Sequence, residues 1–198
     1  VYETMAAILF IIRKIDGLNR IVGAVAGFVA LAMVAVVTMD VIMRYLFNLT
    51  YVFIQELEWH LFGVLFLIGA GYTLLIDGHV RVDVFYQRFS EKTKAWVNLI
   101  GVLFFLLPGC ILILDTSWSF VMRSLAMNEG SPDPGGLPGR YVLKSFIPMG
   151  FAFVALQGVS MGLKAFLTII GKPYAPGLEG DNKPSVTPAE CDSQGGQA

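Results

Sequence analysis

The chain has 198 residues, of which 56% are hydrophobic and only 15% are charged, and its formal net charge is −1. Soluble globular domains carry about 25% charged residues, so this apolar excess fits a chain whose solvent is lipid. The near-neutral charge gives no reason to expect nucleic acid as a partner. The two cysteines lack metal-type or redox-type spacing and predict neither a metal cluster nor a disulfide.

Residues 1–20 combine apolar positions at helical spacing with Arg13, Lys14 and Arg20. In a signal peptide the charges precede the apolar core, whereas here they follow it. We therefore expect an amphipathic helix that lies in the membrane interface, with a disordered arm as the alternative.

Four apolar segments follow, and each is long enough for a membrane helix. From Trp59 to Ile76, for example, 18 residues carry no formal charge and would span about 27 Å as a helix. The predicted fold is an all-α integral membrane protein with a four-helix membrane domain over residues 21–170. Its spans are expected at about residues 21–43, 57–77, 95–119 and 142–166. Pro108 should kink the third span.

The orientation follows from the basic residues. Ten of the 14 Lys and Arg residues lie before the first span, in the 77–94 loop or from residue 164 onward, and four lie in the other two loops. The positive-inside rule then places both termini and the 77–94 loop in the cytoplasm. Residues 171–198 are rich in Gly and Pro and are expected to form a disordered cytoplasmic tail.

Charged residues cluster at the ends of the spans. Asp40 and Arg44 are four residues apart, so on a helix they share a face and can form an ion pair. Glu56 and Glu58 are alternative partners for Arg44. A third interpretation leaves Arg44 snorkelling at the membrane edge.

The sequence predicts no enzyme, cofactor or metal site. His60 and His79 are 19 residues apart, about 28 Å on one helix, and therefore cannot ligate the same haem. No catalytic triad or cation-binding loop is apparent. The predicted spans also lack charged residues near the bilayer midplane, which a self-sufficient transporter usually carries. We therefore expect an accessory or scaffold subunit.

Short motifs occur in order along this frame. They comprise Arg44, Tyr45 and Asn48 after the first span, Glu56, Glu58 and Trp59 opening the second, Gly78, His79 and Asp83 closing it, and then Gly136, Leu137, Pro138, Lys144, Pro148 and Gln157. Together they resemble the small membrane subunit of tripartite ATP-independent periplasmic (TRAP) transporters over about residues 16–165. Residues 132–138 look most like the mannitol/chloroaromatic or C4-dicarboxylate branch. The sequence departs from the resemblance at Gly139, Arg140 and Tyr141, where many relatives have a Trp after the Leu-Pro pair.

The resemblance implies a scaffold, or stator, subunit in the bacterial inner membrane. Its expected partners are membrane lipids, a large membrane subunit that carries the substrate and sodium sites, and a periplasmic solute-binding protein. The transporter would import an organic acid-type solute, driven by sodium, and the 40–58 and 122–144 loops would face the binding protein. The alternatives are a membrane-anchor subunit of a respiratory enzyme and a free-standing four-span scaffold.

Overall fold

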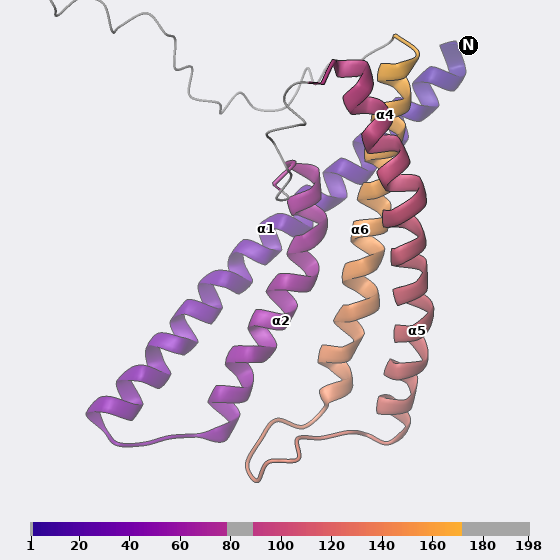
Figure 1. The fold of residues 1–198 in the computed structure, drawn as a ribbon. Helices are drawn as coiled ribbons and strands as arrows, with labels where there is room; N and C mark the ends of the chain where they lie inside the picture. The colour runs from indigo at the N-terminus through magenta and orange to yellow at the C-terminus, as the bar shows by residue number, and fades with distance from the viewer. Residues whose placement is uncertain (1, 79–88, 172–198) are drawn as a thin grey trace, which may run out of the picture.

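A computed structural model describes residues 2–78 and 89–171 of the chain. The described residues form five α-helices and one π-helical turn (Figure 1). These are α1 (Tyr2–Leu46), α2 (Val52–Leu75), α4 (Glu91–Gly101), η1 (Val102–Leu106), α5 (Leu107–Ala126) and α6 (Arg140–Ile169). Since α4, η1 and α5 are continuous, four stretches are long and apolar enough to cross a membrane, which confirms the predicted four-span fold.

Most helix ends lie beyond the predicted spans, because hydropathy marks only the apolar part of a helix; α2 is the exception at its C-terminal end, since it stops at Leu75 rather than at residue 77. The third stretch, for example, begins at Glu91 rather than residue 95. The Ser90 side chain caps it by accepting a hydrogen bond from the Thr93 N–H at 3.3 Å. A polar first turn is therefore stable although it adds nothing to the apolar signal.

The first helix shows no boundary at residue 20. α1 is one helix of 45 residues, about 68 Å long, whereas a bilayer's hydrocarbon core is about 30 Å thick. Ile12 and Asn19 are fully buried, so part of the predicted arm packs against the rest of the protein. The arm is thus a continuation of the first span; its position in the membrane interface stays a prediction.

Three helices are followed by a residue in the left-handed backbone conformation. Asn48, Asp77 and Asn128 have positive φ angles of 52°, 59° and 44°, a conformation that Asn and Asp tolerate better than other non-glycine residues. The N–H of the residue after each of them donates to a carbonyl in the last turn of the helix, five residues back for Gly78 and Glu129 and six residues back for Leu49. The Asn or Asp at each position therefore ends the helix and fixes the direction in which the chain continues.

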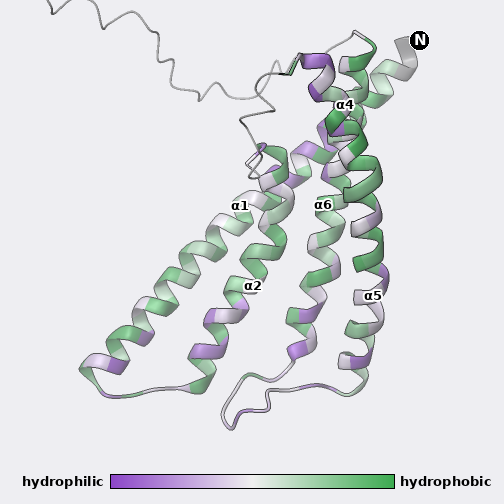
Figure 2. Cartoon of the chain, in the orientation of Figure 1, coloured by the Kyte–Doolittle hydropathy of each residue, from purple (hydrophilic) through white to green (hydrophobic). Residues whose placement is uncertain are grey.

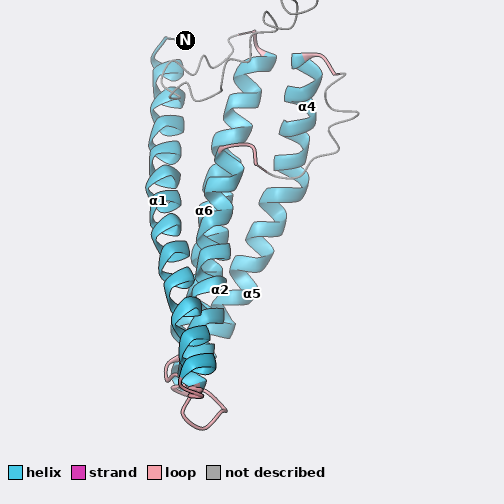
Figure 3. Ribbon diagram, turned by 90° about the vertical axis from the view of Figure 1, so that its left-hand side faces the viewer, coloured by secondary structure: helices cyan, strands magenta, loops and turns pink. Residues whose placement is uncertain are grey.

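The helices are arranged around α6. It contacts α1, α2, α4, η1 and α5, and in Figure 1 it lies between α2 and α5. In the view turned by 90°, the ends of the helices that face the 47–51 and 127–139 loops overlap (Figure 3), so at this end they form a single layer. We call it the loop end. Such a layer leaves wide lateral faces uncovered.

Just before Pro108, where the sequence predicts a kink, the helix forms one wider turn. The Leu107 N–H donates to the Val102 carbonyl, five residues back, which defines a π-turn. Pro108 has no N–H and its ring crowds the Phe104 carbonyl, and one wider turn relieves both problems. The turn also brings Leu106 against α6, where a Cβ on Gly158 would lie 2.4 Å from it.

Hydrophobic residues cover most of the helices, and hydrophilic ones gather mainly toward their ends (Figure 2). Many large apolar side chains are exposed on the lateral faces, such as Phe28 of α1 at 72% and Ile111 of α5 at 64%. Lipid or other membrane helices must cover these faces. The predicted motif residues His79 and Asp83, and most of the predicted tail, lie outside the described residues.

Candidate functional site

The loop end holds an ordered polar site built around Glu56. This carboxylate is only 4% exposed. It accepts hydrogen bonds from the Ser131 hydroxyl and from the Leu137 N–H, the latter at 2.5 Å, and the Arg140 guanidinium lies 3.5 Å away. The N-terminal part of α2 therefore holds the loop between α5 and α6.

The loop itself is folded tightly enough to meet Glu56. The Ser131 N–H donates to the Leu137 carbonyl at 3.1 Å, and the Gly136 N–H donates to the Asp133 carbonyl at 3.0 Å. A Cβ on Gly136 would lie 2.4 Å from the Ser131 Oγ and 2.7 Å from a Glu56 carboxylate oxygen. Only glycine fits this approach without a shift of the loop.

A second carboxylate, Glu129, holds the other side of the loop. It forms an ion pair with Lys144 of α6 and accepts a hydrogen bond from the Ser124 hydroxyl at 2.6 Å. Its carbonyl accepts from the Arg140 N–H at 2.9 Å. The hydrogen bonds from Lys144 and Ser124 lower the pKa of the Glu129 carboxyl below its ordinary value. Asn128, which ends α5, places Glu129 there.

Aromatic rings pack around these charges. The Arg140 guanidinium lies over the Trp59 ring at 5.5 Å, and the Lys144 ammonium lies over the Phe120 ring at 4.1 Å. The Trp59 and His60 rings are 4.0 Å apart, with His60 Nδ1 2.6 Å from the Glu56 carbonyl oxygen. We call the set of Glu56, Glu129, Leu137, Arg140 and Lys144 the loop clamp. It presents the exposed residues 132–135 as a preformed tip.

A second polar cluster joins α1 to α6 near the other end. Asp16 accepts hydrogen bonds from Gln157 at 3.1 Å and Ser160 at 2.7 Å, and its other oxygen lies 2.7 Å from the Lys164 ammonium. Asn19 donates to the Gln157 side-chain oxygen at 2.9 Å. Asp16 is 9% exposed and Gln157 is 2% exposed. These five residues, the buried polar cluster, attach the predicted arm to α6.

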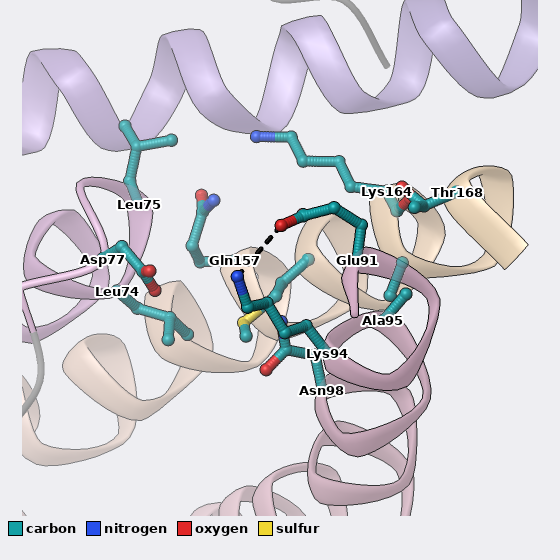
Figure 4. Close-up of a pocket in the computed structure, with 12 residues that line it drawn as sticks. Leu74, Leu75, Asp77, Glu91, Lys94, Ala95, Asn98, Gln157, Lys164 and Thr168 are labelled. Atoms are coloured by element: carbon teal, nitrogen blue, oxygen red, sulfur yellow. Dashed lines mark hydrogen bonds and ion pairs between the residues drawn. The ribbon is translucent and has the colours of Figure 1, made fainter. Parts of the chain in front are cut away.

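A cavity of about 260 Å³ adjoins this cluster, between the end of α2, the start of α4 and α6 (Figure 4). The Lys94 and Glu91 side chains pair at 2.9 Å along its edge, while the Lys164 amine extends toward α1. Its described lining balances these two lysines with Asp77 and Glu91. The balance of charge favours neither an anionic nor a cationic ligand.

The structure brings some of the predicted site residues together and leaves others apart. Glu56, Trp59, Gly136, Leu137 and Lys144 meet at the loop clamp. Gln157 lies in the buried polar cluster, and Pro138 follows Leu137 in the loop. Of the others, Pro148 is inside α6, Gly78 follows the end of α2, and Tyr45 is exposed at the end of α1.

Arg44 forms the predicted ion pair with Asp40. The Asp40 side chain is 5% exposed and that of Arg44 is 44% exposed, so the pair spans a buried and an accessible position. The alternative pairing of Arg44 with Glu56 is wrong, since Glu56 is occupied by the loop. One oxygen of Glu58 is buried without a hydrogen-bond partner among the described residues.

Sequence reasoning missed several residues of both clusters. At the loop clamp these are Glu129, Arg140 as a partner of Glu56, and Ser131, which donates to Glu56; for the buried polar cluster they are Asp16, Asn19, Ser160 and Lys164. One signal was available: Gln157, Ser160 and Lys164 recur at i, i+3 and i+7, the spacing of one helix face. It indicates a polar stripe within an apolar span.

Comparison with known proteins gives the family. No curated protein matches the chain. The family described as "Tripartite ATP-independent periplasmic transporters, DctQ component" matches residues 33–168, which include all four membrane stretches in part or in full. The chain therefore belongs to this family: it is the small subunit of a TRAP transporter, an inner-membrane transport component rather than an enzyme, and works with a large membrane subunit and a periplasmic binding protein.

Proposed function

We propose that this chain is the stationary scaffold of a sodium-driven importer of an organic acid-type solute. In this proposal its lateral faces pack against the large membrane subunit, and its loop end helps to dock the loaded binding protein. Both termini lie in the cytoplasm, so the loop end faces the periplasm. The resemblance to TRAP transporters supports the sodium coupling and the solute class.

The loop clamp is the observation that carries the docking proposal. Glu56 and Glu129 fix residues 129–140 from two sides, through Leu137, Arg140 and Lys144. A loop held in this way loses little conformational freedom when a partner binds, so more of the contact energy is available for binding. A preformed tip at one end of a membrane scaffold suits repeated docking of a soluble partner.

The layered fold supports the scaffold role. The large apolar side chains on the lateral faces of α1 and α5 remain exposed, and α1 has the smallest buried share of the four membrane stretches. Membrane helices associate by packing such faces against one another. The described residues thus leave room for a large subunit beside the layer.

Reconstitution of the three components tests this function. Liposomes that contain the large subunit with this chain should take up the solute when loaded binding protein and an inward sodium gradient are supplied. Liposomes with either membrane subunit alone should not. Equal uptake without this chain would contradict the scaffold role, and equal uptake with a potassium gradient would contradict sodium coupling. Binding-protein affinity that is the same for wild type and Glu56→Gln would contradict docking at the loop clamp.

A further inference from the structure

The outer face of α5 carries a regular stripe of exposed residues. α5 packs on α6 through its buried residues Cys110, Ser117 and Ser124, and it lies at the edge of the layer in Figure 1. On its other side the exposed residues recur at alternating steps of four and three, the spacing of a helix–helix contact. They are Ile111, Asp115, Trp118, Met122 and Leu125, which we call the α5 stripe.

Asp115 lies in the middle of this stripe as its only charged residue. Its carboxylate is exposed and has no hydrogen bond or ion pair with any residue in the described part of the chain. The nearest basic residue along α5 is Arg123, which donates instead to the Ser119 carbonyl at 3.2 Å. The charge of Asp115 is therefore not met by any side chain in the described part of the chain.

Neither lipid nor water suits the whole stripe. From Asp115 to Leu125 a helix rises by about 15 Å, which is half the thickness of the hydrocarbon core. If the hydrocarbon reaches Leu125, Asp115 lies near the midplane as an unpaired charge. If the hydrocarbon ends at Asp115, then Trp118, Met122 and Leu125 face water. An apolar protein surface that carries one cation would pair with the Asp115 carboxylate and also cover the apolar residues of the stripe.

We propose that the α5 stripe is the surface against which a helix of the large membrane subunit packs. That helix would carry a Lys or Arg opposite Asp115 and apolar residues opposite the other four positions. This inference rests on the proposed scaffold function and names the contact within it. A second copy of this chain fits less well, because a symmetric parallel pair of stripes would place two Asp115 carboxylates together.

Site-specific cross-linking tests the contact without disturbing the charge. A photoreactive amino acid is placed at Ile111, on the stripe, or at Leu112, one position off it, in the complex with the large subunit. The two residues are matched, with exposures of 64% and 65%. We expect an adduct with the large subunit from position 111 and little from position 112. Equal adducts from both positions, or only lipid adducts from position 111, would overturn the proposal.

Charge substitution tests the chemistry. Asp115→Lys should lower the amount of large subunit that co-purifies in mild detergent by about tenfold or more, and Asp115→Asn should lower it less. Thr116→Lys places the same charge on the neighbouring exposed position and should leave recovery unchanged. Full recovery with Asp115→Lys, or an equal loss with Thr116→Lys, would refute the contact at the α5 stripe and leave the proposed scaffold function standing. Failure of the wild-type chain to co-purify refutes the scaffold function itself.

Discussion

The Glu56 carboxylate and the backbone N–H of Leu137 form a hydrogen bond of 2.5 Å across 81 residues of sequence. This bond ties the N-terminal part of α2 to the loop between α5 and α6. Because the donor is a main-chain N–H, changing the side chain at position 137 does not remove it. The contact therefore depends on the acceptor at position 56 and on the path of the loop backbone.

Glu56→Gln should loosen this loop. Glutamine keeps an acceptor but loses the charge that strengthens the bonds from Ser131, Leu137 and Arg140. We expect amide hydrogen exchange over residues 129–140 to be about tenfold faster. Glu58→Gln is the control, because Glu58 lies on the same turn and makes no hydrogen bond or ion pair in the described structure. Equal exchange in the two variants would count against the loop clamp.

Gly136→Ala should disturb the same loop by crowding. The added methyl would lie 2.4 Å from the Ser131 Oγ, closer than atoms can approach, so the loop must move away from Glu56. Gly130→Ala is matched to it, since nothing lies within 4 Å of a Cβ there. Binding-protein affinity should fall in the first variant and stay unchanged in the second. If both bind as wild type does, the approach of Gly136 to Glu56 has no role in docking.

The Glu129–Lys144 ion pair should make the loop resistant to acid. The pKa of Glu129 is lowered by its bonds from Lys144 and Ser124, so its contribution to stability is complete above the ordinary glutamate pKa of about 4.3. It is lost only as the pH falls through the lower, folded-state value. Glu129→Gln should therefore melt below wild type at pH 7 and pH 5, with the gap closing under more acidic conditions. A gap that closes between pH 7 and pH 5 would contradict this assignment.

Gln157→Leu should detach α1 from α6. The side chain of Gln157 donates to Asp16 and accepts from Asn19, and its loss leaves both groups with unmet hydrogen bonds in a buried site. We expect a loss of about 1–3 kcal/mol in the free energy of unfolding, measured in mixed detergent micelles. Ser119→Ala, which removes an exposed hydroxyl bonded within its own helix at 3.1 Å, should cost little. Equal losses would mean that the buried polar cluster adds no stability.

Cysteine labelling tests the orientation. In a chain with Cys110→Ala and Cys191→Ser, the exposed positions Asp133 and Lys92 are replaced by cysteine one at a time. Asp133→Cys, at the loop end, should react with an impermeant reagent on intact cells, and Lys92→Cys should react only after the membrane is opened. The reverse pattern would place the termini outside.

Local chemistry explains what the sequence could predict. The spans follow from uncharged apolar runs, and the Asp40–Arg44 pair follows from a spacing of four residues on one helix. Both features depend on residues within a single helix. The continuity of α1 through residue 20 was missed, because a change from apolar to mixed composition resembles a boundary although helical hydrogen bonding continues across it.

The tertiary structure alone decided which distant residues meet. Glu56 pairs with the loop at Leu137 rather than with Arg44, and Asp16 pairs with Lys164, because α6 lies beside both α1 and α2. Helices of similar hydrophobicity gain little from burial in lipid, so their neighbours are chosen by close packing and by a few polar bonds between them. The sequence by itself therefore determined four membrane helices, while the packing of the layer determined the loop clamp and the buried polar cluster.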